Sequence, residues 1–189
     1  MARYQAGLRT EARITESTRE LLGEVGLEAT TLKAICDRAG VRAGSFYNLF
    51  DSKEEVVLRV VGEAIAAVDP DPEGRNIDTL GDLVEAYIRF ITDQSTVAKI
   101  YLQIAVSGAI KDGKLGKRVF RHHESRTARF ADALLRQRPD LDHAEAEART
   151  EVLLATLNGL AFRWMLDPAF DFADHARRAT SSPAIAPSV

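Results

Sequence analysis

Apolar residues recur at spacings of three and four along nearly the whole chain, and this helical periodicity limits the fold more than any other feature. One face of a predicted first helix carries Ile14, Thr18, Leu21, Leu22 and Val25. No stretch alternates apolar and polar residues as a half-buried strand does, and the sequence contains no internal repeat. It therefore predicts an all-α protein.

Glycine and capping residues indicate where the first helices begin and end. Gly26 should end the first helix, in the position of a left-handed C-terminal residue. Thr31 is a suitable N-cap for a short second helix, which Gly40 should end. A third helix is expected over residues 43–50, and Ser52 begins a capping-box pattern that starts a fourth.

A proline-containing segment, residues 70–74, interrupts the helical pattern. Because proline lacks an N–H and disfavours helical geometry before it, the fourth helix must end there. Beyond it, we expect helices over residues 80–93, 97–109, 115–137, 144–166 and 172–179.

These boundaries predict two helical domains. The first covers residues 1–52 and continues into a connecting helix over residues 53–68. The second covers residues 69–180, and a proline-containing tail over residues 181–189 is expected to be disordered.

Residues 31–50 carry the strongest indication of function. Two short helices meet here at Gly40, and their apolar stripes include Ile35 and Phe46, which the first helix must cover. The second short helix keeps a small polar face made by Arg42, Ala43, Ser45 and Asn48. Serine and asparagine on a helix reach base edges in a major groove, and arginine reaches a phosphate or guanine. This is the arrangement of a helix-turn-helix DNA-binding motif.

Three stretches around this motif fall in register with one another: ATTLKAI at residues 29–35, AGV at residues 39–41 and GSFYNLFDSKE at residues 44–54. Together, over about residues 8–60, they resemble the DNA-binding domain of TetR/AcrR-type transcriptional regulators. The resemblance implies an N-terminal three-helix DNA-binding domain and a C-terminal helical domain for ligand binding and dimerisation.

Carried over position by position, the resemblance implies nine DNA contacts. The residues expected to bind phosphates are Thr31, Lys33, Tyr47 and Lys53. Those expected to face the major groove are Ala43, Gly44, Ser45 and Asn48. Arg42 stands where the family usually has a small capping residue, and it would add one donor. Leu49 stands where the family commonly has His or Tyr, so we expect it only to pack.

Simpler interpretations of some of these residues remain open. Tyr47, like Phe46, could be a core aromatic residue, and the lysines of the motif could be ordinary exposed charges. Cys36 is the single cysteine, so an internal disulfide is excluded. Its place on the apolar stripe favours a small buried hydrophobe over a redox sensor.

The helix expected over residues 144–166 is apolar on more than one face. One face could cover its own domain and another a second subunit, and the alternative is a helix wholly inside one subunit. The residues that we assign to dimerisation are Val152, Thr156, Gly159, Leu160 and Arg163. The resemblance implies a homodimer, whose two recognition helices would lie about one DNA turn apart and bind a palindromic operator.

Candidate residues for the wall of an effector site lie between residues 80 and 166 and are mostly apolar. They are Tyr87, Phe90, Ile91, Tyr101, Ile104, Phe120, His123, Asn158 and Phe162, and each could instead be plain core. Residues 111–138 hold nine basic side chains against three acidic ones. This stretch is either a solvated helix face or the anion-binding part of a site for an acyl-CoA-like effector.

The sequence gives little support to an enzyme, a metalloprotein or a membrane protein. His122 and His123 are adjacent and so point to different helix faces, and no zinc, nucleotide or hydrolase motif accompanies them. No apolar run approaches the roughly 20 residues of a membrane span, and the N-terminus has no apolar signal core. We expect no cofactor, no metal and no membrane partner, and a cytoplasmic location.

We therefore predict a ligand-responsive transcriptional regulator, a repressor that binds a palindromic operator as a homodimer and is released by a small, largely apolar effector. The alternatives are an activator or corepressor-type regulator of the same fold, and a helical ligand-binding protein that has lost DNA binding. The net charge of −3 does not exclude DNA binding, because residues 1–60 carry nine basic and nine acidic side chains and the remainder carries 16 and 19. The DNA contact should be small, local and sensitive to salt.

Overall fold

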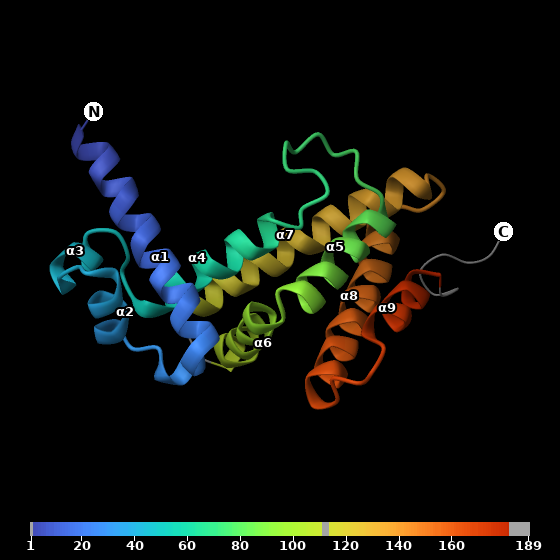
Figure 1. The fold of residues 1–189 in the computed structure, drawn as a ribbon. Helices are drawn as coiled ribbons and strands as arrows, with labels where there is room; N and C mark the ends of the chain where they lie inside the picture. The colour runs from blue at the N-terminus through green and yellow to red at the C-terminus, as the bar shows by residue number, and fades with distance from the viewer. Residues whose placement is uncertain (1, 111–113, 182–189) are drawn as a thin grey trace. The chain divides into compact units, whose positions relative to one another are not determined.

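The computed structural model describes residues 2–110 and 114–181, and all regular secondary structure in these ranges is helical (Figure 1). The helices are α1 (Ala2–Ala29), α2 (Leu32–Ala39), α3 (Ala43–Tyr47), α4 (Lys53–Ala66), α5 (Leu80–Asp93), α6 (Ser95–Ile110), α7 (Lys114–Gln137), α8 (His143–Leu166) and α9 (Phe172–Thr180). The all-α prediction is confirmed. Residues 182–189 of the predicted tail lie outside the described residues.

The chain divides into two compact units. The first comprises Met1–Ala67 and Gln94–Val106, and the second comprises Val68–Asp93 and Ser107–Val189. The change from the first unit to the second at residue 68 coincides with the end of the predicted connecting helix. Most of α6 belongs to the first unit, although the sequence order alone had suggested the second domain, because apolar α6 side chains such as Ile100 are buried.

In the first unit, α1 packs against α2 and α4 around one apolar cluster. Ile14 of α1, Ile35 of α2 and Phe46 of α3 are all fully buried in it. The first helix therefore covers both apolar stripes, as predicted. Leu49 is half-buried against the same cluster and packs as expected. Val25 departs from the prediction, because its side chain is 49% exposed near the end of the regular part of α1.

The predicted caps and breaks have a clear physical basis. Gly26 has φ 76° and ψ −179°, so helical geometry breaks there and α1 resumes for a short turn beyond it. Thr31 accepts a hydrogen bond from the Ala34 N–H at 3.1 Å, and Gly40 ends α2 in the left-handed conformation (φ 61°, ψ 40°). Ser52 accepts from the Glu55 N–H at 3.2 Å, which completes one side of the predicted capping box.

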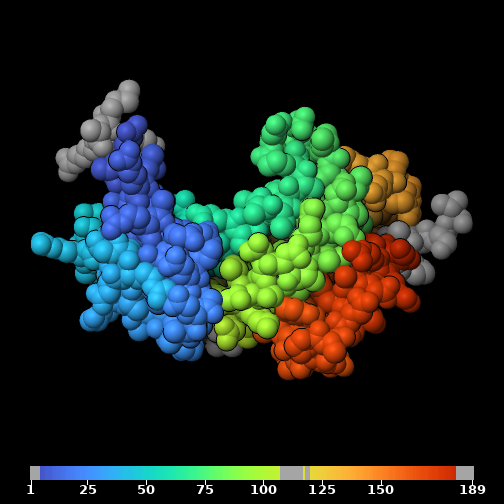
Figure 2. Space-filling model, in the orientation of Figure 1, coloured from blue at the N-terminus to red at the C-terminus, as the bar shows by residue number. Residues whose placement is uncertain are grey.

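In the second unit, α7 packs along α8. Helix α9 packs against both α8 and α5, and its red surface adjoins the green surface of α5 in Figure 2. The inward face of α8 is buried at Ala146, Thr150, Leu153, Leu154, Leu157 and Ala161. Asp142 caps this helix by accepting from the Glu145 N–H at 2.8 Å, as predicted. The spacing of the buried residues leaves a second face of α8 outside this core.

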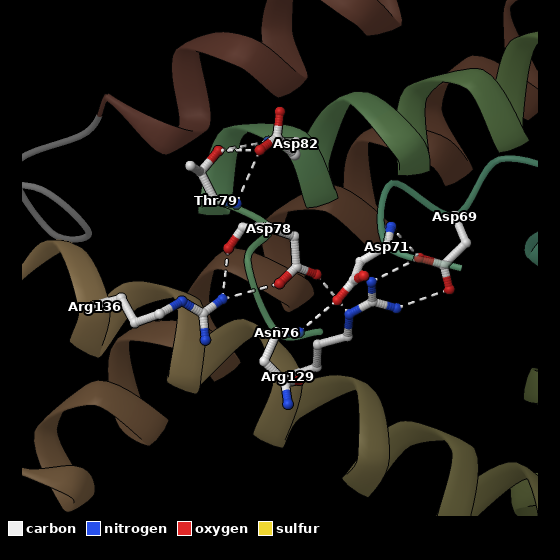
Figure 3. Close-up of polar contacts among 8 residues, drawn as sticks. All are labelled: Asp69, Asp71, Asn76, Asp78, Thr79, Asp82, Arg129 and Arg136. Atoms are coloured by element: carbon white, nitrogen blue, oxygen red, sulfur yellow. Dashed lines mark hydrogen bonds and ion pairs between the residues drawn. The ribbon is translucent and has the colours of Figure 1, made fainter. Parts of the chain in front are cut away.

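Two arginines of α7 hold the loop that precedes α5 (Figure 3). Arg129 donates to both carboxylate oxygens of Asp69 at 2.6 and 3.0 Å, and its Nε donates to Asp78 at 2.7 Å. Arg136 donates to the other Asp78 oxygen at 2.9 Å. Because the Asp78 side chain is only 1% exposed, its charge needs these partners. The same guanidinium of Arg129 holds the pKa of Asp69 below its usual range, mainly by its hydrogen bonds.

Candidate nucleic-acid interface

Helix α3 separates the residues of the predicted DNA-contacting face from the core. Phe46 and Phe50 are buried, and their rings lie 5.6 Å apart. The residues exposed on the opposite side are Arg42, Ala43, Gly44, Ser45 and Asn48. The core residues thus fix the orientation of α3, and its small polar side remains open to a partner.

Tyr47 is an exposed aromatic residue, so the interpretation that it belongs to the core is wrong. Its side chain is 56% exposed and meets the ring of Phe46 edge-on at 5.7 Å. Phe46 supports the tyrosine ring on one side, and more than half of the Tyr47 surface stays accessible to a partner.

Gly44 is not required by the packing of the protein itself. A Cβ built at this position would meet nothing within 4 Å, and the backbone of Gly44 is not in the left-handed region. Since glycine has no side chain, Gly44 leaves open space on the surface of α3. This space allows a close approach by a partner, which is the role that the resemblance implies for Gly44.

The cations of the motif differ in how far internal contacts engage them. Lys33 is exposed and pairs with Asp37 on the next turn of α2, which raises the pKa of its ammonium group. Lys53 is half-buried, and its Nζ donates to the carbonyl of Leu27 at 3.2 Å. Arg42 is exposed, caps α3 with no side-chain hydrogen bond, and forms no ion pair with any described residue. Arg42 is thus the most available donor of the three.

Arg38 has a structural role that the sequence did not reveal. Its guanidinium donates to both carboxylate oxygens of Glu24 at 2.7 and 2.6 Å, which lowers the pKa of that carboxyl group. The pair joins α2 to the end of α1. Glu24 and Arg38 are 14 positions apart, so no helical spacing in the sequence could indicate that they meet.

Thr31 lies exposed at the beginning of α2. Its hydroxyl oxygen accepts from a backbone N–H, which leaves the hydroxyl hydrogen able to donate to an anion. The arrangement of the first unit therefore offers hydroxyl, amide and guanidinium groups around a small-residue surface. Such groups serve to contact phosphates and base edges.

In the second unit, two candidates for the effector site meet directly. The Tyr87 hydroxyl donates to Asn158 Oδ1 at 3.1 Å, and Nη2 of Arg126 donates to the same oxygen at 3.3 Å. Phe90 and Ile91 are buried on the same helix as Tyr87. From the sequence, Arg126 is one of the nine basic residues in the stretch 111–138, and nothing in its spacing distinguishes it from the other arginines there.

The other effector candidates are dispersed. Tyr101 and Ile104 belong to the first unit. Phe120 is 60% exposed and Phe162 is 59% exposed, so both lie on outward faces of their helices. His123 is half-buried, and its Nε2 lies 3.4 Å from Glu151.

The outward face of α8 is apolar as well as exposed. Val152 is 53% exposed, and Leu166, which the sequence interpretation did not select, is also exposed. Between them, Thr156, Gly159 and Arg163 are exposed and Leu160 is half-buried. These positions, with Phe162, recur at helical spacing and form one broad surface. The prediction that this helix is apolar on more than one face is confirmed.

The described residues contain no group of three or more His, Cys, Asp or Glu side chains that could hold a metal ion. Across the same part of the chain, no helix is both long enough and apolar enough to cross a membrane. Cys36 is buried, and burial raises the pKa of its thiol, as expected for a small core residue.

Comparison with known proteins places the motif in a family. The sequence pattern of the bacterial regulatory proteins of the tetR family matches residues 14–60. Over 57 residues, the chain is 45% identical to the HTH-type transcriptional repressor KstR2 of Rhodococcus jostii (strain RHA1). That match covers 30% of this chain and 27% of the repressor, so the chain spans about a quarter of the length of this curated relative.

Solved structures extend the likeness to the whole fold. Thermus thermophilus FadR, a transcriptional repressor in complex with lauroyl-CoA, superposes with a TM-score of 0.66 at 20% identity, over 95% of each chain. A transcriptional regulator from Aquifex aeolicus VF5 superposes with a TM-score of 0.65 at 23% identity, over 91% of this chain and 96% of that one. Residues 14–60 thus carry the sequence pattern of the bacterial regulatory proteins of the tetR family, and the chain shares its overall fold with these two solved structures.

Proposed function

We propose that this protein is a transcriptional repressor that binds a palindromic operator as a homodimer and leaves it when a small, largely apolar effector binds. One observation carries the proposal: α3 exposes Ala43, Gly44 and Ser45 while Phe46 holds the helix in the core. A helix fixed in this way can enter a major groove with small side chains against the bases.

Affinity for the operator would come mainly from phosphate contacts around this helix. Thr31, Lys33, Arg42, Tyr47 and Lys53 are the donors that we assign to phosphates. Ala43, Gly44, Ser45 and Asn48 are the residues that we assign to the groove. Because these contacts lie around one short helix and are largely electrostatic, binding should be local and should weaken as salt is added.

A homodimer would place two copies of α3 on one face of the DNA. The exposed apolar surface of α8, from Val152 to Leu166, supports this assembly because an apolar helix face is stabilised when a second subunit covers it. Gly159 adds no side chain to the middle of that surface, so two helices could approach closely there. A two-fold dimer predicts a palindromic operator.

Release by an effector would follow from linkage, because a ligand that prefers one arrangement of the second unit lowers the affinity of the first unit for DNA. The chain enters the second unit at Val68, and the next residue, Asp69, is held by Arg129. The segment that follows α4 is thus anchored to α7 within the second unit. The complex of Thermus thermophilus FadR with lauroyl-CoA supports an apolar small-molecule effector by analogy.

The experiment is selection of binding sites from a pool of random duplex DNA with the purified full-length protein. The proposal expects enrichment of one palindrome, bound in a 2:1 ratio of protein chains to duplex. Absence of any enriched sequence would favour a ligand-binding protein that has lost DNA binding. Repeating the selection with a cell extract of small molecules distinguishes a repressor, whose enrichment falls, from a corepressor-type regulator, whose enrichment rises.

A further inference from the structure

Three arginines of α7 contact other parts of the second unit, and one of them differs in its partners. Arg129 is neutralised by Asp69 and Asp78, and Arg136 is neutralised by Asp78 (Figure 3). Arg126 lies one helical turn before Arg129 and is half-buried, yet no carboxylate among the described residues pairs with it. The same helix therefore carries two satisfied guanidinium groups and one with an uncompensated charge.

The contacts of Arg126 are with neutral groups. Its Nη2 donates to Asn158 Oδ1 at 3.3 Å, and its guanidinium carbon lies 4.7 Å from the ring centroid of Tyr87 and 5.8 Å from that of Phe130. Its Nε is buried and has no acceptor within the described part of the chain. A guanidinium has five N–H donors that lie in its plane, and stacking on aromatic rings leaves those donors unused.

The surroundings make this charge costly. Burial lowers the pKa of the neighbouring His122, and the positive charge of Arg126 lowers it further. Glu151 of α8 is engaged by other groups, the hydroxyl of Thr127 at 3.0 Å and His123 at 3.4 Å. A half-buried cation without an anion among the described residues is unfavourable, so an anionic ligand that joins the site would stabilise it.

We propose that Arg126, whose guanidinium is positioned by Asn158 and by the ring of Tyr87, binds the carboxylate of an otherwise apolar ligand. A carboxylate accepts two parallel N–H groups of a guanidinium, and the Tyr87 hydroxyl lies 3.1 Å from the Asn158 oxygen that Arg126 also contacts. Phe172 meets Tyr87 edge-on at 6.0 Å, so aromatic surface adjoins the polar groups. The inference rests on the proposed function and narrows its effector to amphiphilic organic acids.

Calorimetric titration of the full-length protein tests this proposal. The probes are carboxylic acids with linear, aromatic and polycyclic bodies, each paired with its own methyl ester, at neutral pH and constant ionic strength. At least one acid should bind about ten-fold or more tightly than its ester, because the ester keeps the apolar body and loses the charge. If no acid binds, or if every ester binds as well as its acid, the proposal is wrong.

Two variants locate the effect. Arg126→Gln should lose the preference for the acid and leave binding of the ester within about three-fold, because only the charged contact is removed. Arg121→Gln is the matched control, since Arg121 is exposed on the same helix, and it should keep the wild-type preference. Retention of the preference in Arg126→Gln, or equal loss of acid and ester binding, would overturn the assignment.

The stability of Arg126→Gln gives a second measurement. Removal of a half-buried cation that no described carboxylate pairs with should leave the melting temperature of the ligand-free protein unchanged or raise it, whereas loss of a merely structural contact would lower it. If Arg126→Gln does not fold, Arg126→Lys is tested in its place. It should lose most of the preference for the acid, because lysine lacks the planar guanidinium that binds both carboxylate oxygens. These titrations contain no DNA, so they test the ligand site independently of DNA binding. If the protein binds an acid but no duplex, the proposed repressor function is wrong and the proposed carboxylate site stands.

Discussion

The ammonium group of Lys53 donates a hydrogen bond to the carbonyl of Leu27 at 3.2 Å, which joins the first residue of α4 to the short turn at the end of α1. This turn follows the break at Gly26 and leads directly into Thr31. The same lysine that we assign to a DNA phosphate thus also supports the fold. An ammonium has three donors, so both contacts can exist at once.

Replacement of Lys53 by Gln should therefore have two effects. The free energy of unfolding should fall by about 1 kcal/mol, because the Leu27 carbonyl loses its donor. The slope of log affinity against log salt concentration for operator DNA should become shallower by about one unit, because one phosphate contact is lost. Urea unfolding and anisotropy titrations measure the two quantities. A lower stability with an unchanged salt slope would assign Lys53 to the fold alone.

Gly44→Ala should lower operator affinity without lowering the stability of the protein. Alanine favours a helix over glycine by up to about 1 kcal/mol, and nothing in the protein obstructs a Cβ at residue 44, so stability should be maintained or raised. Operator affinity should nevertheless fall, because the added methyl group would separate α3 from the DNA.

Gly62→Ala is the matched control for that exchange. Gly62 is exposed on α4, and a Cβ there also meets nothing within 4 Å. This variant should gain similar stability and keep wild-type operator affinity. Equal DNA affinity for the Gly44 and Gly62 variants would contradict the close approach at α3.

The ion pair between Asp69 and Arg129 predicts a dependence of stability on pH. Because Arg129 lowers the pKa of Asp69 in the folded protein, the pair stabilises the fold above the unfolded pKa of about 4, and the stabilisation is lost as pH falls through the lower folded value. Asp69→Asn should cost about 1–2 kcal/mol at pH 7, and the difference from the wild type should shrink below about pH 4. Chemical unfolding at several pH values measures it.

Asp140→Asn provides the comparison. Arg138 lowers the pKa of Asp140 to about 2, yet this pair is exposed and joins residues two positions apart, so solvent screens it and much of it persists in the unfolded chain. Its removal should change stability little. A larger loss for Asp140→Asn than for Asp69→Asn would show that burial is not the deciding factor.

Val152→Glu should convert the proposed homodimer to a monomer. The substitution places a charge on the exposed apolar face of α8, where a second subunit would bury it. Val25→Glu is the control, because Val25 is exposed to a similar extent on α1 and belongs to the other unit. Sedimentation equilibrium at several concentrations measures the mass, and a wild-type protein that is monomeric throughout would contradict the assembly.

The sequence predicts the helices well because their ends depend on local chemistry. Thr31, Gly40 and Asp142 cap or end helices through hydrogen bonds and backbone angles within a few residues. The two apolar stripes around Ile35 and Phe46 likewise required a covering helix, which α1 supplies. Periodicity and capping therefore carry most of the fold.

The partners of charged residues could not be predicted in this way. The acceptors of Arg129 lie 51 and 60 positions away, and Arg38 meets Glu24 across two helices. Such pairs depend on tertiary packing, and any acid at a suitable distance would fit the sequence equally well. For the same reason the uncompensated charge of Arg126 became visible only with the fold.

The most direct test of the account is a titration of the full-length protein with the selected palindromic duplex and with a duplex of scrambled sequence, at one salt concentration near physiological. The account predicts that the palindrome binds at least about a thousand-fold more tightly, and that Tyr47→Phe weakens binding to both duplexes by the same factor. Equal affinity of the wild-type protein for the two duplexes would contradict the claim that α3 reads a specific operator.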